Sequence, residues 1–198
     1  MTILLASGSA HKVAEVRRIL ETAGVTADIV GLGDVSPYPE PVEDGATFED
    51  NALIKARAGF AVTGLPTLAD DSGIEVDVLN RMPGVRSARW AGGHADDQAN
   101  LDLLVRQVAD VAAERRGARF VCTMALVWSG GERVVRGVVE GSLATAPRGE
   151  RGFGYDPLFV PRGETRTTAE LSDTEKDAIS HRGRAVRAMA PYLTEVGE

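Results

Sequence analysis

The segment Arg119–Ala144 (RFVCTMALVWSGGERVVRGVVEGSLA) decides the fold class. Two long apolar and β-branched runs flank Gly130-Gly131, and a glycine pair between such runs is typical of a β-hairpin turn. Around this segment, short apolar runs alternate with helical periodicity, as where Thr2–Ala6 is followed by Ala10–Gly24. A long antiparallel hairpin combined with strand–helix alternation predicts an α/β protein with a mixed central sheet flanked by helices.

Capping signals and apolar spacing indicate further elements. Thr47-Phe-Glu-Asp50 predicts the start of a helix and Gly64 its end. Ser172-Asp-Thr-Glu175 predicts the start of one final helix. The remaining expected elements are a strand at Asp28–Leu32, a proline-rich loop at Ser36–Gly45, strand segments at Thr67–Ala69 and Ile74–Leu79 on either side of an acidic turn at Asp70–Gly73, and a helix at Asp96–Val111.

Composition restricts the class of protein. A chain of 198 residues with 43% hydrophobic residues predicts a single globular domain over 1–198. The net charge of −7 disfavours a nucleic-acid partner. Cys122 lies in an apolar run, which favours a buried thiol over a nucleophile. The sequence shows neither an apolar run long enough for a membrane span nor a signal peptide, so we expect no membrane partner and a cytoplasmic location.

Ser7-Gly-Ser-Ala-His-Lys12 lies between the first expected strand and the first expected helix. Small residues at such a turn let backbone N–H groups and the positive end of the helix face an anion, and Lys12 adds a positive charge. The alternative is a plain turn in which Ser9 caps the helix and Lys12 lies in solvent. These residues alone favour neither interpretation.

Leu68-Ala-Asp-Asp-Ser-Gly73 places two adjacent carboxylates after an apolar strand. Neighbouring residues of an extended segment point to opposite sides, so only one aspartate faces a given substrate. Such an oxygen ligand suits a hard cation such as Mg²⁺. The alternative is an Asx-turn before Gly73.

The proline-rich loop carries Glu40, Glu43 and Asp44 and precedes a helix on which Asn51 and Lys55 share one face. Such a loop could bring a second carboxylate to a metal. On spacing alone, solvated loop acids and a solvated Lys55 are favoured.

Gly149-Glu-Arg-Gly-Phe-Gly-Tyr-Asp-Pro157 is a glycine-rich segment with two aromatic rings. Its glycines allow a flat ligand to approach an aromatic face, and Asp156 is an acceptor for a base edge. The alternative is a tight turn with the rings in the core. Lys176 and Ser180-His-Arg-Gly183 add cations, which in isolation are expected to face mostly solvent.

Six polar and glycine-containing motifs follow one another along the chain, namely Ser7-Gly-Ser-x-x-Lys12, Phe48-x-x-Asn-Ala-x-x-Lys-Ala56, Ala69-Asp-Asp-Ser-Gly73, Pro83-Gly-Val-x-Ser-Ala-Arg-Trp90, Gly152-Phe-Gly-Tyr-Asp-Pro157 and Ser180-His-Arg-Gly183. Together they resemble the inosine/xanthosine triphosphate pyrophosphatases, which cleanse nucleotide pools. The ordered set extends from residue 3 to the last helix and is far more specific than any one motif. One departure concerns Ser9, which stands where the family commonly has asparagine and lacks the reach of a carboxamide.

The resemblance implies an elongated, two-lobed single domain with the site in a cleft between the lobes. It implies a Mg²⁺-dependent homodimer that hydrolyses ITP, dITP and XTP to the nucleoside monophosphate and pyrophosphate. Such an activity prevents incorporation of these nucleotides into DNA and RNA. Attack on the α-phosphorus requires neutralisation of the leaving pyrophosphate, which lysines and Mg²⁺ would supply.

The same resemblance implies roles for individual residues. Asp71 is expected to be the general base and a metal ligand, Glu43 a second metal ligand, and Lys55 a catalytic cation near the phosphates. Arg182, together with backbone N–H groups, is the candidate donor to the 6-oxo group of the base. The residues expected to bind substrate are Ser7, Gly8, Ser9, Ala10, His11, Lys12, Ser72, Phe153, Gly154, Tyr155, Asp156, Lys176, His181 and Arg182.

Two rival functions remain open at this point. A pyrophosphatase resembling the septum inhibitor would act on dTTP or UTP, although its motifs around the acidic turn differ from Asp70-Asp-Ser-Gly73. A catalytically silent nucleotide-binding module would keep Phe153 and Arg182 but could dispense with Asp71. Release of pyrophosphate in the presence of Mg²⁺ separates these possibilities.

Overall fold

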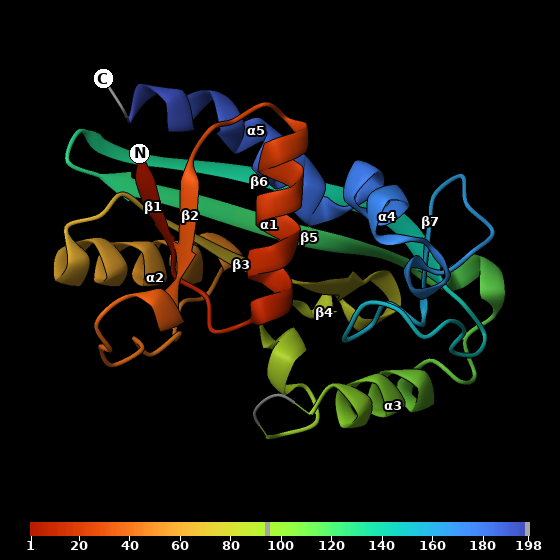
Figure 1. Cartoon of the computed structure of the whole chain (residues 1–198). Helices are drawn as coiled ribbons and strands as arrows, with labels where there is room; N and C mark the ends of the chain where they lie inside the picture. Colours follow the sequence, from red (N-terminus) through yellow and green to blue (C-terminus); the bar gives the residue numbers. More distant parts are fainter. Residues whose placement is uncertain (94–95, 197–198) are drawn as a thin grey trace. The chain divides into compact units, whose positions relative to one another are not determined.

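The computed structural model describes residues 1–93 and 96–196 and shows the predicted mixed α/β architecture with a central sheet (Figure 1). The strands follow the order β2-β1-β3-β5-β6-β7, and β4 pairs with β3. β1 is parallel to β2 and β3, whereas β4 and β7 are antiparallel to their neighbours. The strands are β1 Thr2–Leu5, β2 Asp28–Gly31, β3 Thr67–Val76, β4 Met82–Pro83, β5 Gly117–Trp128, β6 Gly131–Leu143 and β7 Phe159–Pro161. The α-helices are α1 Ala10–Thr22, α2 Phe48–Thr63, α3 Asp97–Gln107, α4 Asp173–Ile179 and α5 His181–Glu195.

The chain forms two compact units. The first unit comprises Met1–Asp71, Cys122–Gly137 and Arg182–Glu198, and the second comprises Ser72–Val121 and Val138–His181. Three strands, β3, β5 and β6, contribute residues to both units. The expectation of a single domain over the whole chain stays a prediction.

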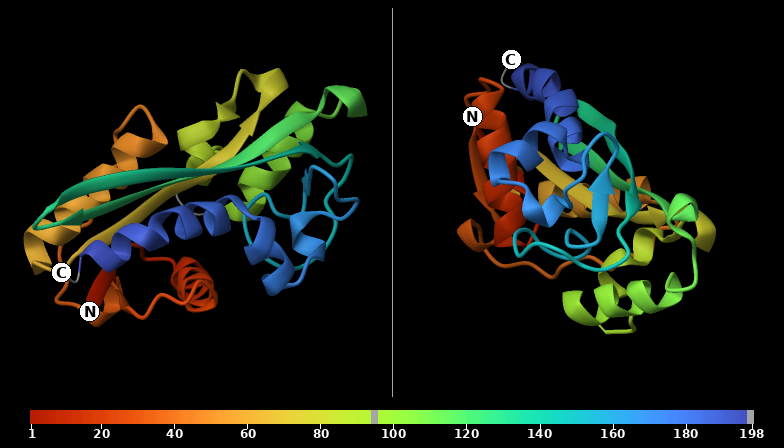
Figure 2. Two further views of the ribbon diagram at one scale, coloured as in Figure 1. Left: turned by 90° about the horizontal axis from the view of Figure 1, so that it is seen from above. Right: turned by 90° about the vertical axis from the view of Figure 1, so that its right-hand side faces the viewer.

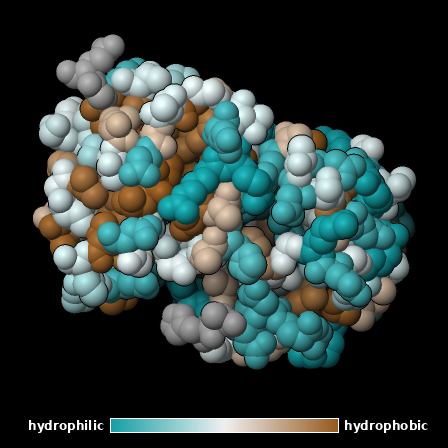
Figure 3. All heavy atoms as spheres, viewed as in Figure 1, coloured by the Kyte–Doolittle hydropathy of each residue, from teal (hydrophilic) through white to brown (hydrophobic). Residues whose placement is uncertain are grey.

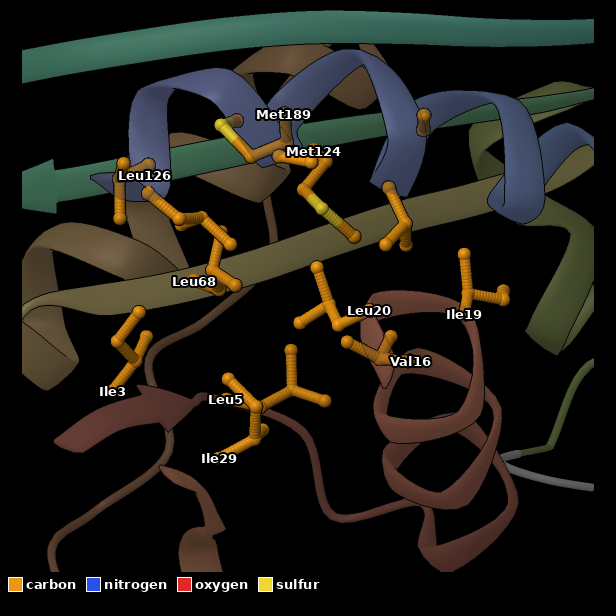
Figure 4. Close-up of a cluster of buried hydrophobic side chains, with 14 of the residues drawn as sticks. Ile3, Leu5, Val16, Ile19, Leu20, Ile29, Leu68, Met124, Leu126 and Met189 are labelled. Carbon is orange, nitrogen blue, oxygen red and sulfur yellow. The ribbon is translucent and has the colours of Figure 1, made fainter. Parts of the chain in front are cut away.

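The core of the first unit lies on both faces of its strands. Leu68 and Leu126 belong to a cluster that α1 and α5 complete (Figure 4). Their neighbours Ala69 and Ala125 belong to another cluster, which contains Ala52 and other residues of α2. Because successive residues of a strand face opposite sides, α2 covers one face of these strands and α1 with α5 the other. Figure 2 also shows α5, in blue, beside β5.

In the core of the second unit, α3 packs against the parts of β3, β5 and β6 that belong to this unit. Leu104 of α3 is fully buried in a cluster with Ile74 of β3 and Leu158. Phe120 and Phe159 meet edge to face in this cluster, with ring centroids 4.6 Å apart. Such aromatic pairs add specific geometry to apolar burial.

Local sequence signals account for the ends of several helices. The side chain of Thr47 accepts a hydrogen bond from the N–H of Asp50, whose carboxylate accepts in return from the N–H of Thr47, and this capping box starts α2. Gly64 ends α2 in the left-handed conformation, with φ at 68°. Among residues 1–93 and 96–196, no helix combines the length and apolar character that a membrane span requires.

The hairpin prediction is confirmed, because β5 and β6 are neighbours in the sheet and only Ser129-Gly130 separates them. The prediction of an acidic turn is wrong. β3 runs without interruption through Asp70–Gly73, and only Asp77–Leu79 leaves it to form a 3₁₀ turn. The carboxylates tolerate this position because side chains distant in sequence bind them, which local patterns do not show.

The prediction of one final helix is also wrong. The capping box of Ser172 and Glu175 starts α4 as expected, but the helix stops at Ser180, whose ψ of 158° is extended. α5 then begins at His181. Serine favours such breaks because its hydroxyl bonds to nearby backbone groups in non-helical conformations. α3 likewise ends at Gln107, earlier than the expected Val111.

Candidate active site

The turn between β1 and α1 contains the predicted anion-binding loop. Ser9 caps α1, because its hydroxyl accepts from the N–H of Lys12 at 3.4 Å, and Ser7 Oγ accepts from the N–H of Ser9 at 3.2 Å. The predicted cap at Ser9 is therefore confirmed, whereas anion binding by this loop stays a prediction. The prediction that Lys12 lies in solvent is wrong, because its Nζ lies 3.2 Å from Asp70 Oδ2. The other members of the loop, Gly8, Ala10 and His11, are exposed.

One face of α2 supplies two polar side chains that bind the part of β3 in the first unit. Asn51 Nδ2 donates to Asp71 Oδ2 at 2.9 Å, and Lys55 Nζ donates to the backbone carbonyl of Asp70 at 2.8 Å. Lys55 Nζ also lies 3.1 Å from Glu43 Oε2, so neither Lys55 nor Glu43 is a simple solvated charge. The shared face of Asn51 and Lys55 that their spacing predicts is therefore confirmed.

Close packing fixes Asn51 at the start of α2. The Asn51 side chain is buried, and its Oδ1 accepts from the N–H of Gly45 at 2.9 Å. A Cβ at Gly45 would lie 2.7 Å from that oxygen, so the loop requires glycine here. The remaining loop acids, Glu40 and Asp44, are exposed, and Glu40 also lines the pocket of this unit.

Asp70 and Asp71 have different surroundings, as the alternation of a strand predicts. Asp70 is buried and accepts hydrogen bonds from Arg182. Asp71 is half-buried and accepts from Asn51. Asp70 therefore pairs with a side chain of α5, whereas Asp71 pairs with a side chain of α2.

The protein raises the pKa of Asp71 above the ordinary value of an aspartate. Burial is the main cause, and the negative charge of Glu43 adds to it. Lys55, the hydrogen bond from Asn51 and Lys12 act in the opposite direction. A carboxylate with a raised pKa is a stronger base than an exposed one, and burial beside lysines is typical of a group that moves protons.

A pocket of about 140 Å³ opens in the first unit. Its lining includes the β1–α1 turn, the proline-rich loop and α2, and it combines two lysines with hydroxyls and acids. Since a water molecule occupies about 30 Å³ of liquid, the volume admits roughly four waters or a phosphate group. The lining residues with chemical functions include Ser7, Ser9, Lys12, Tyr38, Glu43 and Lys55.

Arg182 lies inside the first unit, where its side chain is 1% exposed. It donates to Glu15 Oε2 at 2.6 Å and to Asp70 Oδ2 at 3.3 Å. The expectation that this segment faces solvent is wrong, since Lys176 and His181 are buried as well. The predicted hydrogen bond from Arg182 to a substrate base stays a prediction.

The glycine-rich segment belongs to the second unit and is organised by Asp156. Its carboxylate accepts from the N–H of Phe153 at 2.9 Å, from Thr168 Oγ1 at 2.8 Å and from Lys176 Nζ at 2.6 Å. Lys176 Nζ also lies 5.1 Å from the centroid of the half-buried Phe153 ring. The segment therefore presents an aromatic ring and a cation that one buried carboxylate holds together, with the half-buried Gly154 beside them.

Three further residues of the second unit were expected to bind substrate. Tyr155 is buried and donates to the carbonyl of Ser87 at 2.8 Å, so its ring lies in the core as the tight-turn interpretation predicts. Burial raises the pKa of its phenol. His181 stacks on Phe120 with centroids 4.8 Å apart. Ser72 is half-buried in β3.

Sequence reasoning missed the roles of Asn51, Glu15 and Tyr38. Asn51 binds Asp71, Glu15 binds Arg182, and Tyr38 lines the pocket. A signal exists for Glu15, because it is an acid on the buried side of α1 beside Val16. The partners of Asn51 and Tyr38 depend on chain segments that only the fold brings together.

The similarity of this chain to known proteins extends over nearly its whole length. The model of the Ham1 family matches residues 3–192. A dITP/XTP pyrophosphatase of Nocardia farcinica is 59% identical over 198 residues, which cover 99% of this chain and 96% of the relative.

Solved structures are similar over nearly the whole chain. The nucleoside-triphosphatase and dITP/XTP pyrophosphatase of Mycobacterium abscessus is 57% identical, with a TM-score of 0.77 over 96% of this chain and 100% of that one. A HAM1 protein from Coxiella burnetii is 40% identical, with a TM-score of 0.88 over 98% of this chain and 99% of that one. The resemblance that the six motifs indicate is thus confirmed, and the chain belongs to the Ham1 family.

Proposed function

We propose that this chain hydrolyses ITP, dITP and XTP to the nucleoside monophosphate and pyrophosphate, and so removes these nucleotides from the pools that supply DNA and RNA. The observation that carries the proposal is Asp71, a carboxylate with a raised pKa that interacts with three residues lining one pocket, Lys12, Lys55 and Glu43. The printed names of the relatives, dITP/XTP pyrophosphatase, supply the substrate class.

We propose Mg²⁺ as the cofactor, with Asp71 and Glu43 as its protein ligands. The charge of Glu43 raises the pKa of Asp71, as a nearby carboxylate does. Mg²⁺ is usually held by one or two carboxylates together with substrate phosphates, so this pair of oxygen donors fits it. When bound, Mg²⁺ would neutralise negative charge on the phosphates.

In the proposed reaction, Asp71 takes a proton from a water molecule whose oxygen attacks the α-phosphorus. The bond between the α-phosphorus and the bridging oxygen breaks, and pyrophosphate leaves with that oxygen. Asn51 fixes the orientation of the Asp71 carboxylate through its 2.9 Å hydrogen bond. Lys12 and Lys55 stabilise the negative charge that collects on the leaving pyrophosphate.

Recognition of the base is proposed to involve Phe153. Phe153 offers a ring face on which a purine stacks, and Lys176 and Asp156 hold that ring and its backbone in place. Donors aimed at a 6-oxo group reject adenine, because its amino group would face another donor.

We also propose a homodimer in the cytoplasm, where the nucleotide pools that need cleansing lie. β2 is one edge strand of the sheet, and Figure 3 shows apolar side chains around it. A hollow of about 410 Å³ beside this strand is lined by apolar side chains such as Leu20 and Val25 and by the charged Arg17 and Glu21. Exposed edges and apolar patches are surfaces that a second copy can cover. Sedimentation equilibrium would give twice the monomer mass of 21.0 kDa if the proposal holds.

The activity is tested by measuring pyrophosphate release from ITP, XTP, dTTP, GTP and ATP, each with Mg²⁺ and with EDTA. We expect metal-dependent release confined largely to ITP and XTP. Preference for dTTP would indicate the pyrimidine-directed rival, and binding without release would indicate a nucleotide sensor.

A further inference from the structure

Four charged side chains of the first unit alternate in sign from the core to the pocket. Glu15 Oε2 lies 2.6 Å from Arg182 Nη1, and Arg182 Nη2 lies 3.3 Å from Asp70 Oδ2. Asp70 Oδ2 in turn lies 3.2 Å from Lys12 Nζ. These four residues, called the charge relay below, come from α1, α5 and β3.

The first three members of the charge relay are enclosed in protein. Glu15 is 4% exposed, while Asp70 and Arg182 are each 1% exposed. Burial disfavours the charge of Arg182, yet Asp70 and Glu15 hold its pKa above the ordinary value. Because apolar side chains of equal volume often stabilise a core as well as a buried ion pair does, the fold alone does not require these charges.

Only the last member of the charge relay reaches the pocket. The side chain of Lys12 is 19% exposed and lines the pocket, whereas the side chain of Asp70 is 0% exposed. The cations of Lys12 and Arg182 both contact the same oxygen of Asp70. A metal ion at that oxygen would have to displace at least one of them, and the other carboxylate oxygen, Asp70 Oδ1, is enclosed in protein.

We propose that Asp70 is a positioning residue rather than a metal ligand, and that Glu15 and Arg182 hold its carboxylate so that Lys12 is fixed at the pocket. This inference rests on the proposed function, in which Lys12 stabilises the leaving pyrophosphate. A displacement of about 1 Å in such a group can lower a rate by roughly a hundredfold.

The charges in the relay decide which variants are informative. Asp70→Asn leaves Arg182 paired with Glu15, and Glu15→Gln leaves Arg182 paired with Asp70, so each variant keeps a neutral buried pair. Arg182→Ala would instead leave the buried Glu15 without its cation and Asp70 with Lys12 alone, which is strongly destabilising. Asp70→Asn and Glu15→Gln are therefore the variants to make.

The control is Glu75→Gln. Glu75 is also a buried acid, at 8% exposed, and its Oε2 lies 3.8 Å from Arg119 Nη1. It belongs to the second unit and does not line the pocket. The control thus removes a buried carboxylate from its pair with a half-buried arginine without altering the charge relay.

Two experiments are made on each variant: kinetics, which gives kcat and KM for ITP, and calorimetry without metal, which gives the affinity and stoichiometry of inorganic tripolyphosphate binding. For Asp70→Asn we expect kcat to fall at least about tenfold. Tripolyphosphate binding should keep its stoichiometry and be equal or tighter, because a negative charge beside Lys12 is gone. Glu15→Gln should change kcat and the affinity for tripolyphosphate in the same directions as Asp70→Asn does, but by smaller factors. Glu75→Gln should change neither kcat nor this affinity.

Two results would overturn the proposal. An unchanged kcat in Asp70→Asn would show that Asp70 positions nothing. Weaker tripolyphosphate binding would show that Asp70 itself supports the ligand or the folded pocket. If the wild-type protein releases no pyrophosphate from ITP or XTP, the proposed function fails, while tripolyphosphate binding still decides whether Asp70 behaves as the charge relay requires.

In a Lys12→Met background, the loss of kcat from Asp70→Asn should nearly vanish, because both changes act through the same ammonium. Full additivity of the two losses would contradict a relay that ends at Lys12.

Discussion

Each unit buries an aspartate that pairs with a lysine, but the two carboxylates differ in what else they bind. In the second unit, Asp156 binds Lys176 at 2.6 Å and also accepts from the backbone of Phe153 and the hydroxyl of Thr168. In the first unit, Asp70 binds Lys12 at 3.2 Å and shares its oxygen with Arg182.

This difference shows that a buried ion pair does not by itself identify a reactive site. Asp156 connects the glycine-rich segment to a neighbouring turn. Its carboxylate accepts from the backbone N–H of Phe153 in that segment and from the hydroxyl of Thr168 in the turn. Asp70 instead pairs with two cations, Arg182 and Lys12, and Lys12 lines a pocket. The additional partners of the carboxylate therefore distinguish a fastening role from a positioning role.

The largest expected effect comes from Asp71→Asn in the first unit. Loss of a general base lowers kcat by about 10²- to 10⁴-fold. The substitution keeps the shape and the contact with Asn51, so tripolyphosphate should still bind. Single-turnover measurement of pyrophosphate release checks the rate. Turnover near the wild-type value would show that Asp71 is not the general base and that the first unit is not distinguished by a catalytic carboxylate.

Lys176→Met tests how much the buried ion pair of the second unit contributes to stability. It leaves Asp156 buried without its cation, so we expect the free energy of unfolding to fall by about 3 kcal/mol. Lys12→Met should cost less than about 1 kcal/mol, because its lysine is partly exposed and Asp70 keeps Arg182. Urea denaturation measures both variants. Equal losses would mean that the two ion pairs play the same structural part.

Gly152→Ala tests how tightly Asp156 fastens its segment. Gly152 has φ at 76°, and a Cβ there would overlap the Asp156 carboxylate. Gly154 is the matched control, because its φ is 59° but a Cβ would meet nothing within 4 Å. Thermal unfolding should show a loss of roughly 2 kcal/mol for Gly152→Ala and about 1 kcal/mol for Gly154→Ala. A larger loss for the control would contradict close packing at Asp156.

The smallest expected effect is a shift in the titration of Asp71. Because burial raises its pKa in the metal-free protein, the Asp71 carboxyl should titrate above the ordinary pKa of an aspartate when ¹³C NMR follows it without Mg²⁺. Lys55 lowers this pKa, so Lys55→Met should move the titration to higher pH. Arg57→Met, on the exposed side of the same helix, is the control. A shift to lower pH in Lys55→Met would contradict this electrostatic role of Lys55.

Local signals were sufficient to predict much of the fold. The capping boxes at Thr47 and Ser172 and the left-handed Gly64 depend on residues within one or two turns, so a linear sequence contains all of the partners. The acidic stretch after Ala69 was predicted as a turn because two adjacent carboxylates are unusual inside a strand. Arg182, which makes that strand possible, is 112 residues away from Asp70.

The candidate site was predictable in its residue types but less so in its contacts. Helical spacing placed Asn51 and Lys55 on one face, and strand alternation separated Asp70 from Asp71. Neither pattern reveals that Glu15 neutralises Arg182, because that ion pair joins helices from opposite ends of the chain. Contacts between distant segments follow from packing of the whole fold, and a single sequence does not display them.

The central claim is that water attacks the α-phosphorus, and ¹⁸O-labelled water tests it most directly. ITP is hydrolysed to completion with Mg²⁺ in the labelled solvent, and mass spectrometry locates the label in the products. The account predicts one ¹⁸O atom in the inosine monophosphate and none in the pyrophosphate. Label in the pyrophosphate, or formation of inosine diphosphate and phosphate, would contradict it.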